Sequence, residues 1–264
     1  MLSYEFMQRA ILVGLMLAII IPMIGIVMIN RRTSMIGDAL SHTALSGVAL
    51  GLIIGINPVF ISIIICIVAS FAIEIIRKKF NSFGDMATAI IMSLGIGLAG
   101  ILSDFTPGGT SFESFLFGSI TSVTKEDLII VGIIFILVLF FSLYLYYPIL
   151  YNSISPLMAN LAGVNSKLIS SIFTFLTAIT VAISTKTVGA LMISSLMVLP
   201  VASGLLISKS YKETFIKSII IAIIYMMAGI SASFYLGIKP GGAIVVIAVF
   251  GMIISLIIQK ILKR

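Results

Sequence analysis

Residues 10–29 read AILVGLMLAIIIPMIGIVMI, an unbroken apolar run without a charged side chain. A helix of about 20 residues crosses the roughly 30 Å of hydrocarbon in a bilayer, so this run is long enough to span a membrane. The whole chain has the same character: 60% of its 264 residues are hydrophobic and 9% are charged, whereas soluble proteins carry about 25% charged residues. This composition excludes a cytosolic enzyme, a disulfide-rich secreted domain and, despite the net charge of +7, a nucleic-acid-binding protein.

The other apolar runs are also of membrane-spanning length, and turn residues or charges separate them. They predict an all-α, polytopic transmembrane helical bundle, with residues 1–264 forming a single domain. A β-barrel is disfavoured, because its strands would alternate apolar and polar residues. The expected spans number nine and cover about residues 10–29, 35–55, 58–76, 86–103, 128–147, 167–185, 187–208, 215–236 and 243–259.

Lysine and arginine residues predict the orientation of the bundle, because cytoplasmic loops are enriched in them. Placing the N-terminus outside puts 12 of the 16 Lys and Arg residues in cytoplasmic loops and leaves four outside. Nine crossings then put the C-terminus in the cytoplasm.

Two connections are longer than a simple turn. Residues 103–127 form the extracytoplasmic connection and contain an apolar patch too short to cross, which fits an interfacial or re-entrant segment. Residues 148–166 form a cytoplasmic segment suited to one brief helix, with Ser155-Pro156 at its start and Gly163 at its end. A cytoplasmic helix in the middle of a membrane-spanning chain suggests a docking element.

Ionisable side chains are nearly absent from the expected spans, with Asp38 and His42 as the exception. They stand four residues apart, so they project from one helical face and can converge on one cation. Carboxylate and imidazole suit zinc, and also manganese or iron. Two other readings stay open: the pair could form a structural hydrogen bond, to each other or to a neighbouring helix, or could relay protons. An ionisable residue in a membrane span nevertheless favours a functional site.

Two further patterns concern helix packing and the path. Gly47, Gly51 and Gly55 lie on the face opposite Asp38 and His42 and would allow close approach of a neighbouring helix. The expected sixth span carries a stripe of hydroxyls that could either line a hydrated path or bridge helices by hydrogen bonds, the second being the more common use. The members of this stripe that we consider for path lining are Ser170, Thr174 and Thr177.

The segment around the acid–imidazole pair resembles the permease subunits of bacterial ATP-binding-cassette importers for zinc, manganese or ferrous iron. The resemblance is densest over residues 31–42, which read RRTSMIGDALSH, and continues through Gly47-Val48-Ala49-Leu50-Gly51. Weaker similarity follows along nearly the whole chain, at residues 116–119, 159–163, 188–191 and 199–200.

This resemblance implies the partners and the cargo. It implies a homodimer of permease chains in the bacterial cell membrane, two cytoplasmic ATP-binding subunits, and an extracytoplasmic metal-binding protein that delivers a zinc or manganese ion. Asp38 and His42 match the family residues linked to metal passage. The family's coupling helix, which docks on the ATPase, corresponds to the segment that holds Ala159, Ala162 and Gly163.

Other transport functions fit parts of the same pattern. An ABC permease for metal chelates or cobalamin would share the architecture but need a wider path, and a proton-coupled secondary transporter would use Asp38 and His42 for protons. The chain has no Gly-rich Walker loop ending in Gly-Lys-Ser/Thr. We therefore expect no enzymatic activity in this chain itself, and ATP must be held by a partner.

Overall fold

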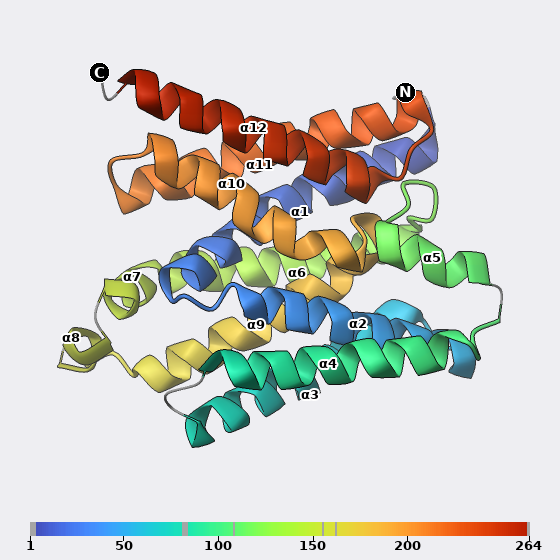
Figure 1. The fold of residues 1–264 in the computed structure, drawn as a ribbon, viewed down its shortest axis with the longest axis horizontal. Coiled ribbons are helices and arrows are strands. Elements are labelled where there is room, and N and C mark those ends of the chain that lie inside the picture. Colours follow the sequence, from blue (N-terminus) through green and yellow to red (C-terminus); the bar gives the residue numbers. More distant parts are fainter. Residues whose placement is uncertain (1–3, 81–83, 108, 155, 162, 263–264) are drawn as a thin grey trace.

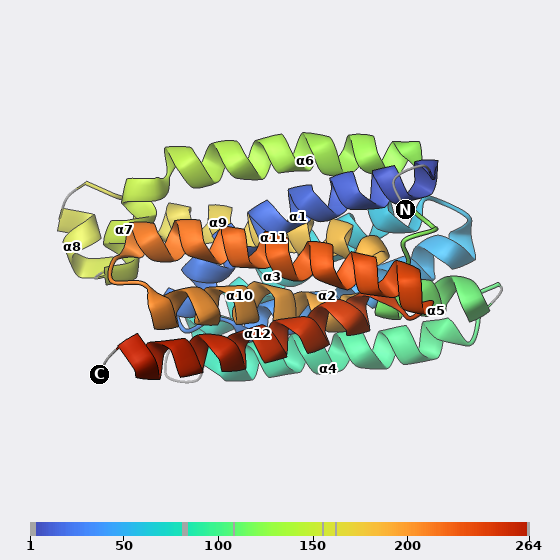
Figure 2. The same ribbon diagram turned by 90° about the horizontal axis from the view of Figure 1, so that it is seen from above.

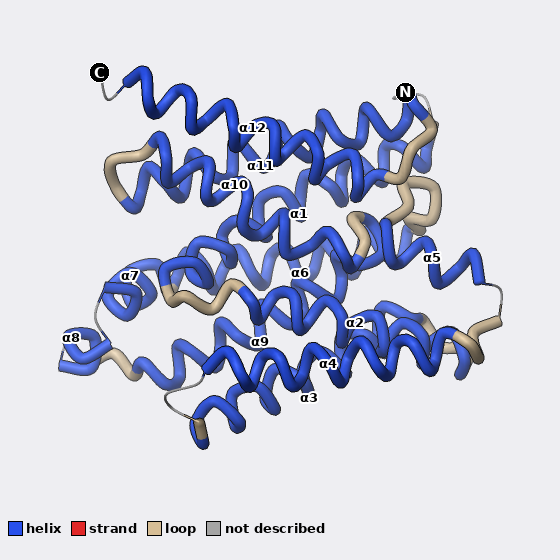
Figure 3. The backbone as a smooth tube through the Cα atoms, in the orientation of Figure 1, coloured by secondary structure: helices blue, strands red, loops and turns tan. Residues whose placement is uncertain are grey.

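The computed structural model describes residues 4–80, 84–107, 109–154, 156–161 and 163–262, and throughout these residues the chain is helical with no strand (Figure 1). Short loops join the helices at both ends of the bundle (Figure 3). In chain order, the elements are α1 (Glu5–Asn30), α2 (Met35–Ile54), α3 (Pro58–Lys79), α4 (Gly84–Ser103), α5 (Gly109–Phe117), α6 (Lys125–Tyr144), α7 (Tyr146–Ile154), α8 (Pro156–Leu161), α9 (Ser166–Thr187), the 3₁₀ turn η1 (Ala190–Met192), α10 (Ile193–Ile207), α11 (Tyr211–Leu236) and α12 (Pro240–Leu262).

Among the described residues, nine helices are long and apolar enough to cross a membrane. They are α1, α2, α3, α4, α6, α9, α10, α11 and α12, which confirms the all-α class and the nine expected spans. The two termini lie at opposite ends of the bundle (Figure 1). We call these ends the α5 end, which also holds the N-terminus, and the α8 end, which also holds the C-terminus.

Short helices occupy the two long connections. The connection 103–127 contains α5. Between α6 and α9 we expected one brief helix, but the chain forms two, α7 and α8, because the fifth span ends at Tyr144 and a new helix begins at Tyr146. The expected helix-capping residue Ser155 lies outside the described residues.

The nine spans divide into inner and outer helices. In the most apolar stretch of each, 78% of α1, 72% of α2 and 67% of α9 is buried, against 22% of α6 and 28% of both α4 and α12. Figure 2 shows α6 at one face of the bundle and α4 and α12 at the opposite face, with the inner helices between them. The helix that carries Asp38 and His42 is therefore an inner one.

The single cysteine belongs to this interior. Cys66 of α3 is fully buried, and its thiol donates a hydrogen bond to the carbonyl of Leu40 in α2, with Sγ and O 3.4 Å apart.

Candidate metal site

The site begins with one partly open strip on a covered helix. Every residue of α2 from Ile36 to Ala49 is buried except Asp38 and His42, which are partly exposed. They lie four residues apart on the same face of the helix. In Figure 1, α2 runs between α10 and α4 on the face turned to the reader. We call this opening, formed by Asp38 and His42, the α2 window.

The polar groups of the α2 window are not used up by local hydrogen bonds. Ser41, Thr43 and Ser46 donate to backbone carbonyls of α2 itself, over 2.8, 2.7 and 2.7 Å. Within the described residues, neither the carboxylate of Asp38 nor the imidazole of His42 has a hydrogen-bond or ion-pair partner. The structural hydrogen bond that we considered from the sequence therefore does not form in the described part of the chain.

The opposite face of α2 packs on α3. A methyl group added to Gly47 would lie 2.6 Å from Cα of Ser62, and one added to Gly51 would lie 2.6 Å from Cα of Pro58. Glycine thus lets these backbones approach, as we expected. Gly55 differs from the expectation: nothing lies within 4 Å of such a methyl group, and its φ of +78° ends the helix in a left-handed cap.

Two more helices flank the α2 window. On the α4 side, a methyl group on Gly95 would lie 2.8 Å from the amide nitrogen of Thr43 and 3.0 Å from the carbonyl carbon of His42. On the α10 side, the sulfur of Met197 lies 3.1 Å from the position that a methyl group on Gly37 would take. Close backbone approach therefore fixes α4 beside His42, and a buried thioether packs beside the residue that precedes Asp38.

The α2 window closes toward the α5 end. Leu45 and Ala49 point in nearly the same direction as Asp38 and His42, yet they are 3% and 0% exposed. Helix α5 and the turn η1 pack against α2, and both lie toward that end of the bundle (Figure 1). Asp38 and His42 are therefore covered on the side of the α5 end.

The hydroxyl stripe of α9 faces a different environment. Ser170 accepts a hydrogen bond from the guanidinium of Arg31 over 2.5 Å, and Thr174 donates to the Ser170 carbonyl over 3.0 Å. Thr174 and Thr177 line a small pocket of about 10 Å³ together with Arg31 and Arg77. None of the described residues that line this pocket belongs to the α2 window.

That pocket is positively charged. Burial lowers the pKa of the Arg31 guanidinium, the positive charge of Arg77 lowers it further, and Glu74 acts in the opposite direction. Glu74 also accepts hydrogen bonds from the hydroxyl of Ser171, over 2.7 and 2.9 Å. Two arginines beside one carboxylate would repel a divalent cation.

The predicted coupling segment presents leucines rather than small residues. In α8, Ala159 is fully buried, whereas Leu157 and Leu161 are 71% and 81% exposed. Gly163 follows with a φ of +78° and open space around it, and Ala162 lies outside the described residues. Among the side chains of α8 whose exposure the structure describes, the two leucines, one turn apart, are able to touch a partner.

Three backbones meet at the α5 end. Methyl groups added to Gly118, Gly189 and Gly241 would each lie less than 3 Å from backbone atoms of another segment. The segments are the end of α5, the turn between α9 and η1, and the start of α12. We call this contact the glycine junction; Gly118 and Gly189 also have positive φ values of +77° and +94°, which L side chains adopt with strain.

A buried ion pair reinforces the same end. Nζ of Lys186 in α9 lies 2.6 Å from Oδ2 of Asp127 in α6, with 17% and 8% of these side chains exposed. The same carboxylate oxygen accepts from the amide and the hydroxyl of Thr124, over 2.8 and 2.7 Å. The amide of Ser119 donates to the Lys186 carbonyl over 3.2 Å. The connection after α5 is therefore tied to α9.

A surface groove of about 430 Å³ lies beside this junction, between α5 and the turn from α11 to α12. Lys239 forms an ion pair with Glu113 along the groove and sits 4.3 Å above the ring of Phe117. Phe6 and Phe234 line its apolar side.

Three of these features were not predicted from the sequence, although two of them left a signal in it. Gly95 was not recognised as a contact beside His42, because nothing in a single chain tells which helix lies against α2. The exposed pair Leu157 and Leu161 was visible as an apolar repeat one turn apart in a polar context. The glycine junction was signalled only by Gly118 and Gly189 in segments that resemble the metal-ion permease family.

Two ionisable side chains that have no partner among the described residues lie on an inner helix of a bundle of membrane-length helices, and such side chains are typical of an ion or substrate pathway in a membrane protein. Residues 3–259 match the ABC 3 transport family, and the chain therefore belongs to this family of ABC transporter permeases. This confirms the family expected from the sequence. The chain is a multi-pass protein of the cell membrane.

Several relatives along nearly the full length are named as metal transport proteins. The chain is 30% identical over 257 residues to the high-affinity zinc uptake system membrane protein ZnuB of Haemophilus influenzae, covering 96% of this chain and 97% of that protein. It is 26% identical over 248 residues to the manganese transport system membrane protein MntC of Listeria monocytogenes, covering 94% and 89%. Its fold is similar to a chain of PsaBC from Streptococcus pneumoniae, solved in complex with a Fab, with a TM-score of 0.86, 26% identity and coverage of 96% and 91%.

Proposed function

We propose that the chain is the permease subunit of an ABC importer for divalent transition-metal ions and that the ion passes through the α2 window. The observation that carries this proposal is the exposure pattern of α2: along a buried stretch, only an acid and an imidazole face an opening, and both lack partners within the described residues. Leaving two such groups unpaired in a membrane is unfavourable unless a cation uses them.

A second copy of the chain would complete the donor set. The described residues hold no group of three or more His, Cys, Asp or Glu side chains that could bind a metal. Zinc in proteins usually has four ligands, and two permease chains facing each other across the α2 window would supply two carboxylates and two imidazoles. A site through which an ion passes must also release that ion, so a small number of metal donors in each chain suits transport.

The orientation expected from the lysines and arginines puts the α5 end outside and the α8 end in the cytoplasm. Cytoplasmic ATP-binding subunits would then dock on α8, with Leu157 and Leu161 as apolar contacts. A metal-binding delivery protein would dock over the connection 103–127. Closure of the ATP-binding subunits would open the α2 window toward the cytoplasm.

The hydroxyl stripe of α9 is left out of this path. Ser170 and Thr174 face Arg31 and Arg77, and the positive charge there disfavours a divalent cation. We assign the stripe to the bridging of helices, the more common use of such hydroxyls.

The test is metal import by the permease reconstituted in vesicles with its ATP-binding subunit and delivery protein. Asp38→Asn and His42→Gln keep the size of each side chain and are expected to lower zinc or manganese import at least about tenfold. Mutation of residues that only hydrogen-bond to a metal ligand already lowers metal affinity or activity by about tenfold or more. Thr174→Ala, which removes a hydroxyl beside the Arg31 pocket, is the matched control and is expected to import normally. Wild-type import by assembled Asp38→Asn and His42→Gln complexes would refute the proposal.

A further inference from the structure

Each chain brings two donors, Asp38 and His42, to the α2 window, and α4 of the same chain places one further side chain beside them. We propose that the thioether of Met92 is a third, soft donor at the α2 window and that it biases the permease toward zinc over manganese. This inference rests on the proposed function, because it assigns the cargo of the same path.

The depth of Met92 follows from the contact at Gly95. Helices α2 and α4 are alternate spans and run parallel (Figure 1). Gly95 abuts the backbone of His42 and Thr43. Met92 precedes Gly95 by three residues, which is about 4.5 Å along the helix axis. It therefore lies level with the residues between Asp38 and His42.

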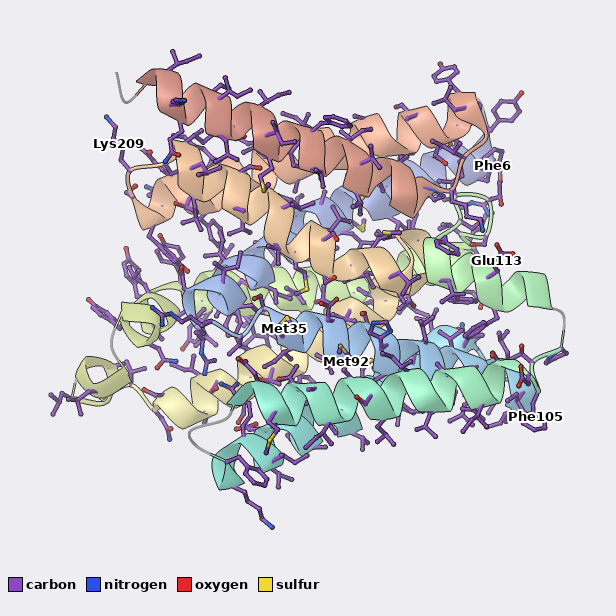
Figure 4. All side chains as sticks on the ribbon, viewed as in Figure 1. Phe6, Met35, Met92, Phe105, Glu113 and Lys209 are labelled. Atoms are coloured by element: carbon purple, nitrogen blue, oxygen red, sulfur yellow. The ribbon has the colours of Figure 1, made fainter. Side chains whose placement is uncertain are left out.

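The direction of Met92 follows from the burial of α4. From Gly95, which faces α2, Met92 lies about 60° around the helix. On the other flank of α4, Ala87 and Ile91 are 0% and 6% exposed, whereas Met92 is partly exposed. Figure 4 labels Met92 at the seam between α2 and α4, on the same open face. Met92 also packs against the buried apolar residues of the bundle, so its thioether lies at the edge of the core, along the seam between α4 and α2.

The chemistry of sulfur supplies the selectivity. Thioethers are soft donors and favour soft or borderline cations such as zinc, whereas carboxylates, carbonyls and water suit manganese. Asp38 and His42 alone serve either ion. A neighbouring thioether therefore adds to the stabilisation of zinc and contributes little for manganese.

The experiment compares import of radioactive zinc and radioactive manganese, each competed by the other ion, in vesicles that hold the full complex. Met92→Leu keeps the volume and removes the sulfur, so the preference for zinc over manganese should fall about three- to tenfold, as expected for loss of one weak neutral donor. Met92→Gln replaces sulfur by a hard oxygen at similar length and should shift the preference further toward manganese. Met86→Leu is the matched control, because Met86 is 42% exposed and lies six residues before Met92 on α4.

The outcomes separate the two proposals. An unchanged preference in both Met92 variants, while Asp38→Asn still abolishes import, would overturn the role of Met92 and leave the path intact. A preference changed equally by Met86→Leu would also overturn it, because the effect would then not belong to the α2 window. Import that is insensitive to Asp38→Asn would instead overturn the proposed function itself.

Discussion

Gly95 shows how one absent methyl group shapes the α2 window. Its backbone lies against His42 and Thr43, so the position of α4 and the direction of the imidazole depend on the same contact. A backbone cannot yield as a flexible side chain can, and close-packed interiors transmit such strain to their neighbours.

We predict that Gly95→Ala destabilises the protein by about 1–3 kcal/mol, the usual effect of overpacking, and slows metal import by displacing His42. Thermal unfolding in detergent and vesicle import would measure the two effects. Gly97→Ala provides the control, because no atom lies within 4 Å of its added methyl group and alanine favours helix more than glycine does. Equal stability of the two variants would refute the role assigned to Gly95.

The ion pair of Asp127 and Lys186 gives a second prediction at this scale. Asp127→Asn keeps the shape of the side chain but leaves a mostly buried Lys186 without its counter-charge, so we expect a loss of about 3–5 kcal/mol in stability. Adding Lys186→Met should restore most of that loss, because the remaining charge is removed as well. If the double variant unfolds as readily as Asp127→Asn in the same thermal assay, the charge explanation fails.

The two residues on which the proposed metal site depends could be predicted from the sequence. Asp38 and His42 could be predicted because ionisable groups in an apolar span are rare. The surroundings of His42 could not be predicted, because the neighbour that supplies Gly95 is separated from it by a whole helix and a turn. Gly55 was misread for a related reason: glycine spacing alone does not distinguish close packing from a left-handed helix end.

At the scale of whole elements, helix α8 buries its alanine and exposes its two leucines. Ala159 packs inward while Leu157 and Leu161 project from the α8 end, so a partner would meet an apolar ridge one turn long. Exposed leucines on a short helix at the end of the bundle are typical of an interaction site.

We predict that Leu157→Ser and Leu161→Ser each weaken binding of the ATP-binding subunit by about 1–2 kcal/mol, within the range measured for interface contacts. Folding should be unaffected, because both side chains are exposed. Co-purification and ATPase activity of the complex would report the change. Tyr151→Ser in α7, 51% exposed at the same end, serves as the comparison; an equal effect there would mean that α8 is not the docking element.

Across the whole molecule, the number of spans was predictable and their arrangement was not. Run length and the positions of charges gave nine spans, because the bilayer imposes one length on every crossing. Which spans lie inside was hidden, because α1 and α12 are both strongly apolar, yet α1 is largely buried and α12 mostly faces outward. Lipid tails are as apolar as leucine, so hydropathy does not separate a core helix from a lipid-facing one.

The native protein should not react with water-soluble thiol reagents, because its only cysteine, Cys66, is fully buried between α3 and α2. Any cysteine introduced at an exposed position is therefore the single reactive thiol of the molecule, without prior removal of the natural one. Fluorophores or spin labels can be attached at Tyr151, which is exposed at the α8 end, or at the rim of the groove beside Glu113, and movement at either end of the bundle can be followed during turnover in an otherwise unaltered chain.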